Sequence, residues 1–161
     1  NSVTLARSGW FGTSARGSAL WSGDIFSDWA TLRASVMTNL GAQLSGIGWG
    51  ASDVGGYRLW DIHAMPPGEL VLRWFQFGLT CPLLRQHGHR PETVPWAYGP
   101  VFGPLITDVI RLRASLRHTY LRPTHDRLAD EGRPINRPVW WDFPDDAEAW
   151  TDAVAHTQYM F

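Results

Sequence analysis

Two aspartates, Asp24 and Asp53, stand where carboxyl groups can do chemistry, because each follows an apolar run and lies in a glycine-containing turn. Asp24 ends the segment Trp21–Asp24, and Asp53 lies within Ser52–Gly56. A carboxyl group that faces a pocket can act as a general acid or base, or can orient hydroxyls, and Trp21 would help to desolvate Asp24. The same positions suit aspartates that only cap a turn. Both interpretations stay open on these residues alone.

Hydrogen-bond donors are concentrated at Arg7 and in the segment Arg85–Arg90, which contains His87 and His89. Such donors suit a polar ligand rich in oxygen atoms. Metal binding is the rival interpretation for His87 and His89. Because no further ligand lies at a standard spacing for zinc, we predict no metal site.

Composition excludes several classes of function. The chain has 161 residues and a formal net charge of −1, so no basic excess is present to neutralise phosphates, and we expect no nucleic-acid partner. No apolar run approaches the roughly 20 residues of a membrane span, so no membrane partner is expected. Neither a glycine-rich phosphate loop nor a Gly-X-Ser-X-Gly elbow occurs, which disfavours a nucleotide-binding domain and a serine hydrolase.

Ten tryptophans are the most unusual feature of the composition. Tryptophan buries a large apolar area and keeps one polar N–H group. The side chains therefore suit either core packing or stacking against flat apolar faces, such as those of sugar rings. Composition alone does not choose between these two roles.

The elements that must position these residues alternate along the chain. Apolar runs typical of strands occupy residues 3–6, 19–21, 44–49 and 80–84, and helical spacing occupies residues 27–41, 66–78 and 103–121. This alternation predicts an α/β fold with parallel strands. In a barrel, as in a doubly wound sheet, the loops after the strands carry the chemistry, so the pattern does not separate the two folds. After Pro123 we expect a polar turn at 130–134, an extended aromatic segment at 138–143 and a short or irregular helix at 147–161.

An ordered set of segments that spans nearly the whole chain resembles glycoside hydrolase family 31. The matching segments are Arg7–Trp10, Trp21–Asp24, Leu44–Ile47, Ser52–Tyr57, Arg73–Gly78, Pro82–Gly88, Pro95–Trp96, Arg133–Phe143 and Gln158–Phe161. The resemblance implies a partial TIM (β/α)8 barrel, made of its later strands and helices, over residues 1–122. Residues 123–161 would then be the barrel exit and the start of a C-terminal β-domain.

The same resemblance implies a retaining α-glycoside hydrolase without a cofactor, and Asp24 matches the acid/base. Arg7 matches an arginine that binds sugar hydroxyls near the reaction centre, and His87 a histidine that binds the sugar in the −1 subsite. Asp53 matches a supporting pocket aspartate, and Trp21 and Trp49 would form apolar walls. These residues should therefore converge at one rim, with Asp24 facing a sugar-sized hollow.

The substrate expected from the resemblance is an oligosaccharide or glycoside with a terminal α-linked glucose or xylose. Gly50 and Ser52 depart from many members, which carry an aromatic residue and a histidine there, so α-galactosides and sulfoquinovosides also stay open. The family's nucleophilic aspartate lies on an earlier barrel strand that the sequence lacks. The remainder of the barrel would come from the same chain, which we favour, or from another chain. The alternative function is a non-catalytic carbohydrate-binding or scaffold subunit built from the same half-barrel.

Half a barrel leaves strand edges and part of its core uncovered. We therefore predict that the isolated 161-residue chain is degraded rapidly in limited proteolysis, whereas the same segment within a complete barrel resists the protease. A sharp, cooperative and protease-resistant fold of the isolated chain would contradict this prediction.

Overall fold

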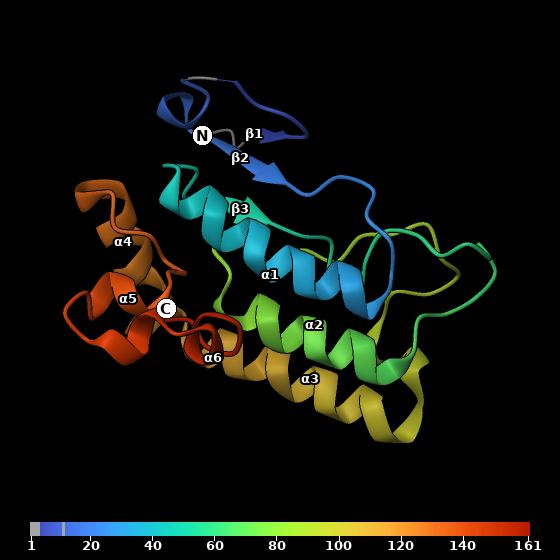
Figure 1. Cartoon of the computed structure of the whole chain (residues 1–161). Helices are drawn as coiled ribbons and strands as arrows, with labels where there is room; N and C mark the ends of the chain where they lie inside the picture. Colours follow the sequence, from blue (N-terminus) through green and yellow to red (C-terminus); the bar gives the residue numbers. More distant parts are fainter. Residues whose placement is uncertain (1–3, 11) are drawn as a thin grey trace.

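The computed structural model describes residues 4–10 and 12–161, and its elements follow the expected alternation in the first two thirds of the chain (Figure 1). The strands are β1 (Thr4–Ala6), β2 (Ser18–Trp21) and β3 (Gly50–Ala51). The α-helices are α1 (Trp29–Leu44), α2 (Gly68–Thr80), α3 (Gly99–Ser115), α4 (Arg122–Glu131), α5 (Val139–Asp142) and α6 (Asp152–Ala155). The 3-10 helices are η1 (Ser14–Arg16), η2 (Pro95–Tyr98) and η4 (Ala147–Trp150), and η3 (Arg117–Leu121) is a π-helix.

The strands form one parallel sheet in the order β1-β2-β3, in which Leu20 pairs with Gly50 and Trp21 with Ala51. A further parallel bridge joins Asp53 to Arg85 and adds the segment after α2 as the next neighbour. Each strand segment thus pairs with the next one along the chain, and Figure 1 shows α1, α2 and α3 on the same side of the sheet. A doubly wound sheet would place helices on both faces. The arrangement is therefore that of a barrel wall.

Helix α1 differs from the expected helix at both ends. Its N-cap is Asp28 rather than the neighbouring Ser27, and the Asp28 carboxylate accepts a hydrogen bond of 2.7 Å from the backbone N–H of Thr31. At the other end the helix passes through Gly41 and continues to Leu44. The left-handed glycine that closes the turn is Gly46, at φ +81°.

The prediction of strands at 44–49 and 80–84 is mostly wrong. Because α1 extends to Leu44 and the chain turns at Ser45–Gly46, pairing is confined to the end of this run, where Trp49 accepts a hydrogen bond from Leu20 and β3 follows. In the run at 80–84, Thr80 is the last residue of α2. The bridge to Asp53 is made by Arg85, one residue after the run. Apolar runs of this length do not distinguish a strand from the end of a helix.

Helix α2 is the centre of the core, because Leu70, Val71 and Trp74 are buried and pack in one cluster with Ile106 of α3. Most other tryptophans do not take the core role. Exposed tryptophans are Trp10, Trp29, Trp60, Trp96, Trp141 and Trp150. More than half of the ten tryptophans of the chain therefore lie at exposed positions.

The last third of the chain is more helical than expected. The predicted helix at 103–121 begins earlier, at Gly99, and ends at Ser115 before η3. Pro123 then lies in the first turn of α4, where proline is tolerated, and Gly132 ends α4 at φ +68°. The segment at 138–143 contains a helical turn rather than an extended strand. Strand-like pairing after residue 123 consists, among the described residues, of an antiparallel bridge between Arg137 and Met160. No described helix is long and apolar enough to cross a membrane.

A buried amide cluster fastens this last third to the barrel wall. Asn136, which is fully buried, accepts hydrogen bonds of 3.0 Å from Asn39 and Gln43 of α1. Its own amide nitrogen donates to the carbonyl of Thr80 at the end of α2, and its backbone N–H donates to Gln43. One side chain thus satisfies polar groups of two helices.

We predict that Asn136→Ala lowers the free energy of unfolding of a protein that contains the whole barrel by about 2–3 kcal/mol, because Asn39 and Gln43 lose the acceptor that they share and the Thr80 carbonyl loses its donor. Chemical denaturation measures this change. The matched control is Gln158→Ala, which removes an exposed amide and should change stability by less than about 0.5 kcal/mol. Equal effects of the two substitutions would contradict the structural role of Asn136.

Candidate active site

Arg7 and Asp24 meet where β1 and β2 end. Arg7 Nη1 donates to Asp24 Oδ2 at 3.2 Å, and the Asp24 side chain is 35% exposed. Gly23, at φ +75°, turns the chain between β2 and Asp24 in a conformation that favours glycine. The carboxyl group of Asp24 is therefore held by an arginine and still reachable from solvent, as a group that exchanges protons with a ligand must be.

Asp53 is the most buried charge of the site, with 0% of its side chain exposed. Its Oδ1 accepts a hydrogen bond from Arg85 Nη1, and its Oδ2 has no partner among the described residues. The parallel bridge between Asp53 and Arg85, with a 2.9 Å bond from Val54 N–H to the Arg85 carbonyl, fixes this ion pair in register. Burial raises the pKa of Asp53, whereas the charges of Arg85 and His87 lower it.

The candidate residues follow neighbouring strand segments: Asp24 comes after β2, Asp53 after β3, and His87 after the bridge at Arg85. The negative charge of Asp24 adds to the rise in the pKa of Asp53, and His87 opposes it. Because the strands are parallel, the Arg7–Asp24 pair, Asp53 and His87 all lie toward the same edge of the sheet. His87 is also in ring contact with Tyr57, with centroids 5.3 Å apart.

Arg90 holds the loop that follows Asp53. Its guanidinium is buried and donates to the carbonyl groups of Val54, at 3.0 Å, and of Gly55 and Gly56. Gly56 has φ +74°, and a Cβ there would lie 2.7 Å from the carbonyl oxygen of Phe26. This shape of the loop therefore requires glycine at position 56, and Arg90 stabilises it through three carbonyl groups.

Sequence reasoning missed Arg85 and Arg90 as functional residues, although it noted that residues 85–90 are rich in donors. The signal in the sequence that could have identified them was Asp53, because a carboxylate buried just after a strand requires a cation or several hydrogen-bond donors close by. Two arginines in the next post-strand loop are the candidates for that partner.

The two predicted tryptophan walls differ in position. The guanidinium of Arg85 lies over the ring of Trp21, 5.5 Å from its centroid, so Trp21 lies beside the Asp53–Arg85 pair. Strand alternation puts Trp49 on the same face as Ala51 and Asp53, but one pleat earlier. There its ring contacts His125 of α4, with centroids 4.9 Å apart, and none of the described contacts joins it to the Arg7–Asp24 pair.

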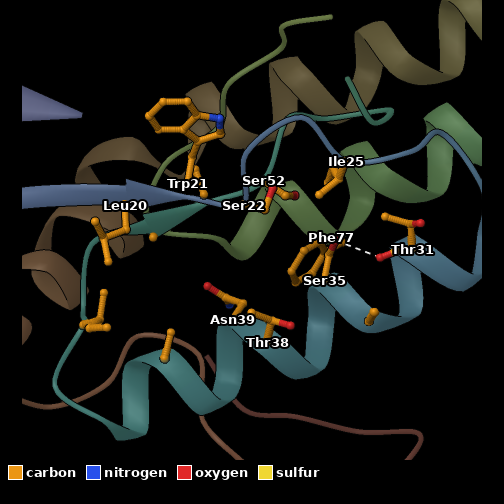
Figure 2. A pocket seen from close by; sticks show the side chains of 15 residues that line it. Leu20, Trp21, Ser22, Ile25, Thr31, Ser35, Thr38, Asn39, Ser52 and Phe77 are labelled. Carbon is orange, nitrogen blue, oxygen red and sulfur yellow. Dashed lines mark hydrogen bonds between the residues drawn. The ribbon is translucent and has the colours of Figure 1, made fainter. Parts of the chain in front are cut away.

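A cavity of about 390 Å³ lies behind the sheet, between the strands and α1 (Figure 2). Figure 2 shows Leu20 pointing toward α1 and the ring of Trp21 pointing to the other side of the strand. Asp24, Asp53 and His87 do not line this cavity. The hollow expected beside Asp24 is thus not this one, because the inner side of a barrel wall becomes enclosed only when the remaining strands are in place.

The residues around Asp24 could together bind a ligand with several hydroxyl groups. It offers one accessible carboxyl group, guanidinium donors and an indole wall. Among the described residues, no group of three or more His, Cys, Asp or Glu side chains could hold a metal ion.

Comparisons with known proteins give a consistent result. Residues 1–120 match the family model described as the glycosyl hydrolases family 31 TIM-barrel domain. Over 159 residues the chain is 35% identical to an alpha-xylosidase of Saccharolobus solfataricus and 34% identical to neutral alpha-glucosidase C of Mus musculus, covering 99% and 97% of the chain. A crystal structure of an alpha-xylosidase from a soil metagenome, complexed with xylose, superposes with a TM-score of 0.89 at 35% identity, covering 99% of this chain and 26% of that one.

The chain spans only part of these relatives, namely 21% of the Saccharolobus solfataricus protein and 16% of the Mus musculus protein. The match therefore covers one contiguous piece of a longer barrel protein.

The Asp53–Arg85 pair generates a prediction about pH. In a protein with the whole barrel, Arg85→Met should lower the free energy of unfolding by about 2–3 kcal/mol near neutral pH, because it leaves a buried carboxylate without its counter-charge. The loss should shrink as the pH falls through the raised pKa of Asp53, since a protonated Asp53 has no charge to offset. Denaturation between about pH 4 and about pH 8 measures both effects.

Arg73→Met is the matched control, since Arg73 pairs with Glu69 at 3.5 Å on an exposed face of α2. It should change stability by less than about 0.5 kcal/mol across the pH range. A loss for Arg85→Met that is the same at both ends of the range would show that the arginine acts through packing rather than charge.

Proposed function

The chain belongs to glycoside hydrolase family 31, and from this we propose that it forms the second half of the catalytic barrel of a retaining α-glycoside hydrolase. The observation that carries the proposal is the position of Asp24, an accessible carboxyl group at the end of β2, beside Arg7 and close to the buried Asp53.

In the proposed reaction, Asp24 acts as the acid/base. A retaining glycosidase needs two carboxyl groups about 5–5.5 Å apart, one that attacks the anomeric carbon and one that protonates the leaving oxygen and then activates water. Asp24 would take the second role, and a barrel strand outside these 161 residues would supply the nucleophile. Arg7 donates to the carboxylate of Asp24, which is the form that activates water. A sugar hydroxyl that accepts from Arg7 would compete for this donor when the glycoside binds.

The proposed sugar contacts come from residues around Asp24. Asp53 and His87 would accept from and donate to hydroxyls in the −1 subsite, and Trp21, kept in place by Arg85, would form an apolar wall. Trp49 stays a predicted wall residue. Its contact with His125 supports a place deeper in the barrel than the Arg7–Asp24 pair. No cofactor is required for this chemistry.

The proposed substrates are glycosides and oligosaccharides with a terminal α-linked xylose or glucose, in line with the names of the relatives. The remainder of the barrel, in the same or another chain, would be the necessary partner. We also propose that the barrel ends near residue 122 and that residues 123–161 lead toward a β-domain. The end of the family match at residue 120 and the Arg137–Met160 bridge support this division.

Replacing Asp24 tests the function directly. In the full-length protein, Asp24→Asn should lower kcat/KM for an α-linked disaccharide by about 10²–10⁴-fold, because the leaving sugar oxygen can no longer be protonated. Hydrolysis of an α-glycosyl fluoride, whose leaving group needs no acid, should fall much less. Steady-state kinetics with the two substrates measure the difference.

Asp28→Asn is the matched control, because it makes the same change at the exposed N-cap of α1, where asparagine caps as well as aspartate. Its kinetics should equal those of the wild type. Unchanged disaccharide hydrolysis by Asp24→Asn would remove Asp24 from the acid/base role, and absence of any glycosidase activity in the wild type would favour the non-catalytic alternative.

A further inference from the structure

A second cavity, of about 570 Å³, lies between the end of α3, η3 and α4. Five of the described side chains that line it are basic, namely Arg113, Arg117, His118, Arg122 and His125. Among the described lining residues, the acidic one is Asp126. This α3–α4 cavity is therefore a basic pocket.

The α3–α4 cavity lies toward the opposite edge of the sheet from Asp24. The His125 ring contacts Trp49, and Leu128 of α4 lies so close to Gly48 that a Cβ there would come within 2.3 Å of it. Gly48 and Trp49 precede β3, whereas the candidate active site follows the strands. Figure 1 likewise shows α4 at the end of the sheet away from the tips of the strand arrows. A ligand in this cavity would not reach Asp24.

Positive charge in the α3–α4 cavity exceeds negative charge. Arg122 pairs with Asp126 at 3.9 Å, whereas Arg113 and Arg117 form no ion pair with any described residue. Arg113 is half-buried and donates to two carbonyl groups at the end of α2 and to that of Pro82. Carbonyl groups satisfy its N–H donors without neutralising its charge. Three arginines against one aspartate therefore leave two positive charges in excess when both histidines are neutral.

His125 adds a nitrogen atom without a partner to the cavity. Its Nε2 is buried and makes no hydrogen bond to a described residue. Burial and the charge of Arg113 lower the pKa of His125, whereas the Pro82 carbonyl and Asp126 act in the opposite direction. The imidazole is therefore neutral near pH 7. A ligand oxygen in the cavity can supply the missing partner, as donor or acceptor according to the tautomer.

The local structure makes the cavity accessible to a small molecule. Arg117 and His118 belong to η3, and a π-helix is rare and often marks a functional site. Both residues are exposed, so a ligand in solution can reach them. Apolar side chains of Leu84, Ile110 and Leu121 complete the wall. The volume falls in the range of pockets that hold small organic molecules.

From these observations we infer that the α3–α4 cavity binds a phosphate group. A phosphate group carries about −1.5 to −2 charges near neutral pH, which matches the excess of positive charge, and its oxygen atoms accept hydrogen bonds from guanidinium N–H groups. Arg117 binds it directly, and Arg113 and Arg122 contribute their charges. The phosphate is either free or carried by a small ester whose organic part packs against the apolar wall. This site does not depend on the proposed glycosidase function.

Calorimetric titration of the full-length protein tests the site, with inorganic phosphate and phenyl phosphate as probes at an ionic strength held constant with sodium chloride. We expect saturable binding of at least one probe at one site. Arg117→Met should weaken this binding about 10–100-fold, because it removes a charge-assisted hydrogen bond. Its melting temperature without phosphate should equal that of the wild type, since the side chain is exposed. Tighter binding of phenyl phosphate would identify an ester as the ligand, and tighter binding of inorganic phosphate would identify free phosphate.

Arg111→Met is the matched control, because it removes the same charge from α3 at an exposed position that pairs with Asp108 at 3.3 Å and does not line the cavity. Its phosphate affinity should stay within about twofold of that of the wild type, since salt screens an exposed charge outside the site. Equal weakening by the two substitutions would show non-specific attraction to surface arginines and would overturn the inference. Unchanged binding by Arg117→Met, or no saturable binding of either probe to the wild type, would overturn it as well.

Discussion

Parallel pairing between consecutive strand segments is the constraint on which the rest of the structure depends. Because β1, β2 and β3 run in the same direction and each pairs with its neighbour in the chain, their carboxyl ends reach the same edge. Arg7, Asp24 and Asp53 each come shortly after one of these strands. The pairing therefore brings together three side chains that are separated by up to 46 positions in the printed sequence.

The main electrostatic cost of this arrangement is the burial of the Asp53 carboxyl group. A buried carboxylate is unfavourable unless cations or donors surround it. Arg85, which forms a parallel bridge with Asp53, also forms an ion pair with its carboxylate. Arg90 fixes the backbone of the following loop through three carbonyl groups. The site thus combines one buried, rigidly held carboxylate with one accessible carboxyl group at Asp24, a division that suits positioning on one side and proton transfer on the other.

The same topology explains why the chain is only part of a working unit. Its sheet has β1 at one edge and the short Arg85 segment at the other, and each edge of a barrel wall must pair with a further strand. The helices on the outer face already have a connected core around Trp74 of α2. Outer packing is therefore largely present within these residues, whereas enclosure of the inner side depends on strands from outside them.

The sequence by itself determined the alternation of strands and helices, the helix after Pro66 and Pro67, the turn at Gly132 and the identity of Asp24, Arg7, Asp53 and His87 as candidates. These features depend on local periodicity, on turn chemistry and on an ordered set of motifs. Only the tertiary structure decided where α1 ends, that residues 44–49 yield a two-residue strand, and that Trp49 contacts His125 whereas Trp21 contacts Arg85. The tertiary structure alone also decided the ion pair of Asp53 with Arg85 and the ring contact of Phe26 with Trp60. The physical reason is that each of these side-chain contacts joins residues at least 32 positions apart, and strand register and helix packing, rather than any local preference, set which of them meet.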